Sequence, residues 1–187
     1  SLNLIARSII FIKYSFSSIR LAFKLKPEII IATSTPLTVS IPAIIMRKIF
    51  GTPFIFEVRD LWPKLPIAMG LLKNKIIIFI LKLLEKISYE SADMILGLAP
   101  GIVEEILKKN ISKEKVVLIP NISDIDFFGV NNKNRKKTEL LKKYDKNIDK
   151  TNLIAAFTGA HGIANGLYDL LNVAKILKGL GRNDIKL

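Results

Sequence analysis

The stretch Pro53-Phe54-Ile55-Phe56-Glu57-Val58-Arg59-Asp60-Leu61-Trp62-Pro63 decides the fold and contains the first candidate site. Its short apolar run, bounded by turn residues, predicts a buried strand of a parallel sheet. The charged residues Glu57, Arg59 and Asp60 fall at or just beyond the carboxyl end of that strand. Ligands bind at this edge of open α/β sheets, because loops from successive strands converge there. The alternative is a solvated Arg59–Asp60 surface pair, with Trp62 as a core side chain.

Strand and helix patterns alternate along the rest of the chain. Apolar runs predict strands at 28–32, 53–57, 92–96, 115–119, 153–157 and 184–187. Longer patterns predict helices over 2–25, up to about Phe50, over 71–90, over 100–110 and over 167–180. The proline-rich stretch 61–70 is predicted to be an irregular loop. This alternation is typical of βαβ units, so the sequence predicts an α/β fold with parallel sheets.

The helices at 71–90 and 167–180 each have a predicted core side. The members are Ile76, Ile80, Leu83, Leu84 and Ile87 in the first, and Leu170, Leu171, Ala174, Leu177 and Leu180 in the second. The first helix also has a second stripe, made of Lys75, Phe79, Lys82 and Lys86. A basic stripe that contains an aromatic residue is typical of a helix lying on a membrane surface, and a simply solvated face is the alternative.

Composition excludes several classes of site. The 187 residues include no cysteine and one histidine, which excludes disulfides, thiolate chemistry and the usual multi-histidine zinc sites. The net charge is +13, and lysine dominates the basic residues. Lysine lacks the bidentate fork that reads bases, so we expect no sequence-specific nucleic-acid binding; anionic membrane surfaces suit lysine well. Biased codon composition is the alternative explanation of the lysine content.

The apolar run from Ile29 to Met46 raises the question of a membrane span. It contains Pro36 and Pro42, and therefore predicts a strand, a turn and a helix start in place of a spanning helix. We expect a cytoplasmic protein with peripheral contact at the inner face of the plasma membrane. A change to basic, weakly apolar sequence marks a domain boundary. The predicted parts are a first domain at 1–125, a basic linker at 126–150 and a second domain starting at 151–187.

Four stretches carry a family resemblance, and they follow one another in the family's order. They are "EIIIATSTP", "PFIFEVRDLWPKLPIAMG", "YESADMILGLAPGIVEEIL…KVVLIPNISD" and "FTGAHGIANGLYDLLNVAKIL". Together they resemble bacterial family 4 glycosyltransferases of the O-antigen and capsule branch. The resemblance implies the GT-B fold, in which two Rossmann-like domains face each other. The family's first strand and its donor-gripping motifs have no counterpart here, so we expect an interior fragment that is inactive alone.

The resemblance implies a reaction and a set of site residues. A hexosyl or N-acetylhexosaminyl group would move, with retention, from a nucleotide-diphosphate donor to a hydroxyl of a lipid-linked saccharide. No cofactor and no metal are implied. Asp60 would position or deprotonate the acceptor, Arg59 would orient it, and Glu57 would support both. The acceptor-side residues would be Thr33, Ser34, Thr35 and Trp62, and the donor-binding residues would be Gly159, His161, Gly162, Asn165 and Gly166.

The glycine-bearing loop has physical properties that suit a phosphate. Gly159, Gly162 and Gly166 let the backbone turn tightly and approach a ligand closely. The loop leads into a helix amino terminus, whose free N–H groups favour anions. Its spacing differs from GxGxxG, so an NAD site is not expected, and an ordinary glycine-rich turn is the alternative. Two rival functions stay open: a non-enzymatic basic module that uses Lys133–Lys150 and the helix stripes, and another GT-B enzyme such as a sugar epimerase.

Overall fold

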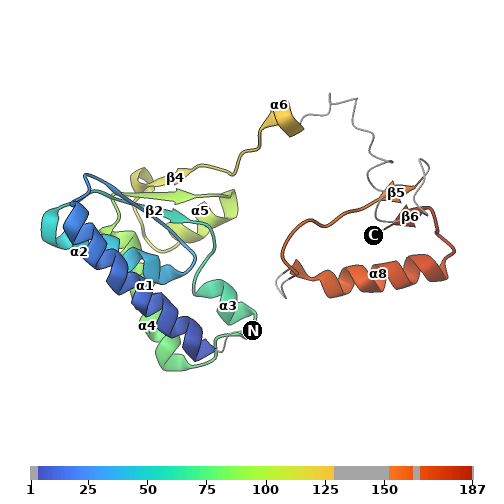
Figure 1. Cartoon of the computed structure of the whole chain (residues 1–187), viewed down its shortest axis with the longest axis horizontal. Coiled ribbons are helices and arrows are strands. Elements are labelled where there is room, and N and C mark those ends of the chain that lie inside the picture. The colour runs from blue at the N-terminus through green and yellow to red at the C-terminus, as the bar shows by residue number, and fades with distance from the viewer. Residues whose placement is uncertain (1–3, 129–151, 162–164, 187) are drawn as a thin grey trace. The chain divides into compact units, whose positions relative to one another are not determined.

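The computed structural model describes residues 4–128, 152–161 and 165–186 (Figure 1). Two compact units are present, Ser1–Ile122 and Ser123–Leu187. Most of the basic linker that we expect at 126–150 lies outside the described residues, as does Lys133–Lys150. Only a short helix, α6 (Ile125–Phe128), is described near its start.

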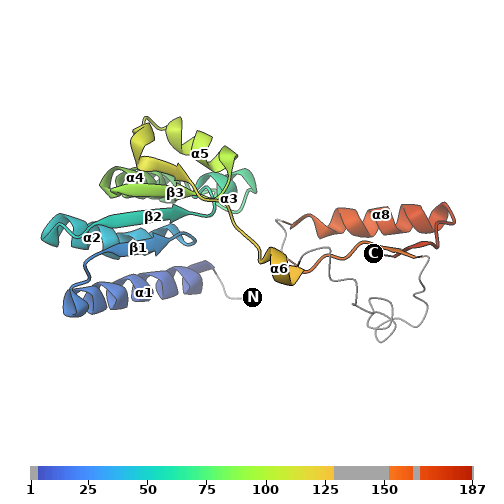
Figure 2. The same cartoon turned by 90° about the horizontal axis from the view of Figure 1, so that it is seen from above.

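The first unit is built on a four-stranded parallel sheet. Its strands are β1 (Ile30–Thr33), β2 (Phe54–Val58), β3 (Met94–Gly97) and β4 (Val116–Leu118). They pair in the order β1-β2-β3-β4, and Figure 2 shows them in that order from the α1 side to the α5 side. The structure therefore confirms the Rossmann-like parallel sheet and the positions of its strands.

Helices connect these strands. They are α1 (Leu4–Leu25), α2 (Ser40–Phe50) after a 3-10 turn at Leu37–Val39, α3 (Lys64–Ala68), α4 (Lys75–Ser91) and α5 (Pro100–Leu107), with a second 3-10 turn at Lys113–Lys115. α2 ends at Gly51, whose φ of 69° is the left-handed conformation that glycine adopts at helix ends. α4 begins after Asn74, whose side chain accepts hydrogen bonds from the N–H groups of Ile76 and Ile77.

One face of the sheet carries the core. Phe54, Phe56 and Val58 are buried on it, and the Phe56 ring lies 5.9 Å from the ring of Tyr89 in α4. The cluster also includes Ala32 and Ile95 from the sheet, Ala43 and Ile44 from α2, Ile106 from α5, and Leu37 and Ala92. Because these residues form one cluster, α2, α4 and α5 cover the same face, as right-handed crossovers between successive neighbouring strands require. On the opposite face Ile31 is 63% exposed.

The stretch 61–70 forms a helix where a loop is expected, and the prolines explain why this is possible. Pro63 precedes α3, and Pro66 lies in its first turn. The first N–H groups of a helix have no partner within the helix, so a proline there removes no hydrogen bond. A pattern rich in proline is therefore compatible with one short helical turn.

The predicted core stripe of α4 is wrong for its amino-terminal half. Ile76, Ile80 and Leu83 are 72%, 56% and 47% exposed. The helix packs instead through a side that includes Leu81, Leu84, Glu85, Ser88 and Tyr89. Apolar residues surround most of this helix, so their periodicity alone does not select a face. A buried hydrogen bond of 2.7 Å between the hydroxyls of Ser88 and of Ser40 in α2 joins the two helices on the packed side.

No helix in the described part of the chain combines the length and the apolar character that crossing a bilayer requires.

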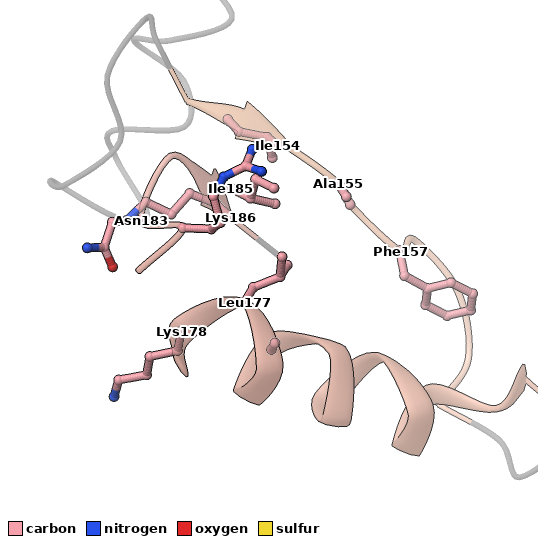
Figure 3. Close-up of a pocket in the computed structure, with 11 residues that line it drawn as sticks. Ile154, Ala155, Phe157, Leu177, Lys178, Asn183, Ile185 and Lys186 are labelled. Atoms are coloured by element: carbon pink, nitrogen blue, oxygen red, sulfur yellow. The ribbon is translucent and has the colours of Figure 1, made fainter. Parts of the chain in front are cut away.

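The second unit is a single βαβ arrangement of β5 (Leu153–Ile154), α8 (Leu167–Gly179) and β6 (Ile185–Lys186), with the strands parallel. A cavity of about 520 Å³ lies between α8 and the strands. Figure 3 shows the residues that line it, with Leu177 pointing toward Ile185. The predicted core is therefore not closed: Leu171 and Leu180 are 61% and 70% exposed, and Leu170 is also exposed. Two strands of two residues provide too little surface to cover the apolar side of this helix.

Candidate functional site

The carboxyl ends of β1 and β2 bring together two segments that the sequence places far apart. Thr33 lies opposite Glu57 in the parallel register, so the loops that follow both strands leave the sheet side by side. One loop carries Ser34 and Thr35, and the other carries Arg59 and Asp60. This is the edge at which parallel sheets bind ligands.

Two hydroxyl–carboxylate hydrogen bonds connect the strand ends. The Thr33 hydroxyl donates to Glu57 Oε2 at 2.6 Å, and the Thr35 hydroxyl donates to Asp60 Oδ2 at 2.8 Å. Each carboxylate is thus oriented by a threonine from the neighbouring strand or loop. In the described structure the Glu57 side chain forms no hydrogen bond or ion pair with Asp60 or Arg59, so its contact with the site runs through Thr33.

Ser34 holds the two loops against each other. Its backbone N–H donates to the carbonyl oxygen of Glu57 at 2.9 Å, and its hydroxyl accepts from the Arg59 N–H at 3.1 Å. The residue is 1% exposed. Ser34 therefore fixes the backbone from which the Arg59 side chain extends.

Asp60 and Arg59 are the accessible charges of the site. Both are exposed, and within the described residues the guanidinium of Arg59 forms no ion pair with Asp60. The structure therefore does not show the Arg59–Asp60 ion pair that was the alternative interpretation of this charged cluster. An exposed carboxylate next in sequence to an exposed guanidinium suits a ligand that has both a hydroxyl group and negative charge. Trp62 is half-buried and packs against the core cluster.

The loop before α8 is described except for residues 162–164, so Gly162 lies outside the described residues. Asn165 Nδ2 donates to the carbonyl oxygen of Ala160 at 2.6 Å, which closes the loop. Gly159 lies so close to the Phe157 ring that a Cβ at this position would be 3.2 Å from it. Gly166 precedes α8 with a φ of 60°, and no side chain caps the helix there.

A cavity of about 510 Å³ lies beside this loop. Phe157 and His161 contribute to its lining, and their ring centroids are 6.2 Å apart. The other lining residues are apolar: Ala155, Ala156, Leu167, Leu170, Leu171 and Ala174. The uncapped N–H groups of the first turn of α8 could bind an anion, although the carboxylate of Asp169 in that turn would oppose it.

Among the described residues, no group of three or more His, Cys, Asp or Glu side chains is arranged to hold a metal ion.

The comparisons with known proteins concern the first unit. A family model described as a glycosyl transferase 4-like domain matches residues 12–122. That range contains Thr33, Glu57 and Asp60, whereas the loop before α8 lies outside it. A search of the curated proteins found no match.

Proposed function

The chain belongs to the family of glycosyl transferase 4-like domains, and on this premise we propose that it serves to transfer a sugar from a nucleotide-diphosphate donor to a hydroxyl of a lipid-linked saccharide. The observation that carries the proposal is the pair of Asp60 and Thr35 at the ligand-bearing edge of the sheet. This edge lies inside the range that matches the family.

Asp60 is the residue to which we assign the acceptor hydroxyl. Thr35 occupies Oδ2 through one hydrogen bond and leaves Oδ1 for a hydroxyl that loses its proton as the glycosidic bond forms. Arg59 lies next to it and would orient the acceptor or bind a negative group on it. Glu57 supports the edge through Thr33, and the half-buried Trp62 offers an indole surface for a sugar ring.

The donor belongs, in this proposal, to the loop before α8. The diphosphate of the donor would be surrounded by loop residues, namely Gly159, His161, Gly162, Asn165 and Gly166. The N–H groups at the start of α8 would stabilise its negative charge. Transfer of a hexosyl or N-acetylhexosaminyl group with retention, without metal or cofactor, completes the proposal. Synthesis of cell-surface polysaccharide such as O-antigen or capsule is the pathway class.

A lipid-linked acceptor would require contact with the inner face of the plasma membrane, and α4 offers a surface for it. Phe79 is 68% exposed, and Ile76 and Ile80 beside it are exposed as well. Lys75 and Lys82 lie on the same stripe of the helix. Exposed apolar side chains flanked by lysine suit an interface between acyl chains and anionic headgroups.

The test is Asp60→Asn in the protein at its native length, assayed with a labelled nucleotide-diphosphate sugar and a lipid-linked acceptor. Loss of the proton acceptor should lower kcat by about 10²–10⁴-fold, with little change in donor affinity. Glu28→Gln is the matched control, because it makes the same chemical change at the opposite edge of the sheet.

The opposite result is equally clear. If Asp60 has no catalytic role, its substitution should cost under about 1 kcal/mol of stability and leave turnover intact. Normal turnover with a normal thermal melt would therefore refute the assignment.

A further inference from the structure

Lysines from three separate elements line one pocket of the first unit. The pocket has a volume of about 360 Å³ and lies between α3, α4 and the segment that follows α5. Lys64, Lys82 and Lys109 line it, together with Pro63, Ile67, Ala68 and Glu85. A second pocket of about 300 Å³ shares Lys82, Glu85 and Lys109 and adds Lys86. Lys64 and Lys82 are 18 residues apart in the sequence, and Lys82 and Lys109 are 27 residues apart, so no local motif predicts the pocket.

Glu85 is the one acidic residue that lines these two pockets, and both of its carboxylate oxygens already accept hydrogen bonds. Glu85 is 3% exposed; its Oε2 accepts from Lys109 Nζ at 2.8 Å, and its Oε1 accepts from the Tyr89 hydroxyl at 3.3 Å. The negative charge of Glu85 is therefore neutralised by Lys109, and the buried carboxylate is not exposed to a ligand in the pocket.

The remaining lysines leave an excess of positive charge. Lys64 shares Glu105 with Lys108. Lys82 forms no hydrogen bond or ion pair with any residue that the structure describes. A pocket with one unpartnered ammonium group, and two more lysines in its wall, favours an anion with several oxygen acceptors.

Apolar surface adjoins this charge. Phe79 lies three residues before Lys82 on α4, which places the two side chains next to each other on the helix surface. Leu83 is 47% exposed beside them. A ligand with a phosphate group and an attached apolar chain would satisfy both parts of this surface.

We propose that the pocket lined by Lys64, Lys82 and Lys109 binds the phosphate group of an anionic membrane lipid, with the acyl chains of the bilayer against Phe79. The proposal deepens the membrane contact proposed above, and it is independent of the role of Asp60. It would also bring α3, which begins four residues after Asp60, to the membrane surface.

The experiment compares Lys82→Gln with Lys48→Gln in the 187-residue chain. Both variants remove one exposed lysine of the first unit, but Lys48 lies in the last turn of α2 and only Lys82 lines the pocket. Binding is measured by sedimentation with phosphatidylcholine vesicles that contain phosphatidylglycerol, and soluble glycerol phosphate is titrated separately by NMR. Because Lys82 has no hydrogen-bond or ion-pair partner in the described part of the chain, the substitution should leave the fold intact, and a thermal melt checks this.

We expect Lys82→Gln to weaken vesicle binding by roughly fivefold and Lys48→Gln by less than about twofold. Glycerol phosphate should perturb the NMR signals of the pocket in the wild type and not in Lys82→Gln. If glycerol phosphate binds and vesicles do not, the pocket would still be a phosphate site, but for a soluble phosphate ester and not for a membrane lipid.

Equal losses in the two variants would overturn the pocket and leave only a general electrostatic attraction of the basic chain to the membrane. Absence of binding to either probe would overturn both the pocket and the membrane contact. Neither result would bear on glycosyl transfer, which the Asp60→Asn assay tests.

Discussion

Tyr89 shows how a single buried residue makes the fold sensitive to pH. It is 1% exposed, and its ring packs against Phe56 of the sheet. Burial raises the pKa of its hydroxyl well above the ordinary value of 10.0, and the neighbouring carboxylate of Glu85 raises this pKa further. The folded state therefore holds the phenol neutral, and ionisation of Tyr89 favours the unfolded chain.

The stability that Tyr89 contributes is complete below its ordinary pKa of 10.0 and is lost as the pH rises above that value. We expect the free energy of unfolding to fall as the pH rises above about 10, and to fall less steeply in Tyr89→Phe. Urea titrations at a series of pH values measure this. Tyr14→Phe, at a position that is 55% exposed, is the control and should follow the wild type. Identical slopes in wild type and Tyr89→Phe would contradict the expectation.

At the scale of the element, α4 packs against both α2 and the sheet of the first unit. Its packed side joins α2 and the sheet, while other parts of its surface carry Lys82 and Phe79. Its amino terminus is set by Asn74, whose Oδ1 accepts from the N–H groups of Ile76 at 2.9 Å and Ile77 at 3.2 Å. These two donors would otherwise lack a partner within the helix.

Asn74→Ala should therefore destabilise the first unit by about 1 kcal/mol. The loss is measured as a lower urea midpoint with an unchanged dependence of free energy on urea concentration. Asn74→Asp keeps the accepting oxygen at the positive end of the helix dipole and should be close to the wild type. A midpoint that does not move in Asn74→Ala would mean that the cap contributes nothing in solution.

At the scale of the whole molecule, the two units differ in how much they bury. The first contains one core cluster whose members run from Ala32 to Ile106 in the sequence, whereas no residue of 152–161 or 165–186 is buried. Local stability follows the burial of apolar contacts and of backbone hydrogen bonds. The second unit should therefore open far more easily than the first.

Hydrogen exchange measured residue by residue checks this difference. Amides of β2 and β3 should exchange more than about 100-fold more slowly than those of β5, β6 and α8. Each amide is compared with its own intrinsic rate, so that local sequence effects cancel. Equal protection in the two units would show that the second is as stable as the first.

The sequence by itself determined the strands, their parallel orientation and the edge that carries the candidate site. These depend on short apolar runs and on turn residues such as Gly51, which act within a few positions of the chain. From the same reasoning Thr33 and Asp60 were expected at one edge of the sheet, and the structure places them there. Their catalytic roles stay predictions.

Only the tertiary structure decided which sides of the helices are covered and which distant charges meet. Ile76 and Ile80 are apolar and yet exposed, because the face of α4 is chosen by what packs against it. The pocket brings together three lysines, Lys64, Lys82 and Lys109, because α3, α4 and the segment after α5 lie close to one another. Such contacts join residues that are far apart in the chain, so neither periodicity nor spacing in the sequence predicts them. They are set by the way the helices pack on the sheet.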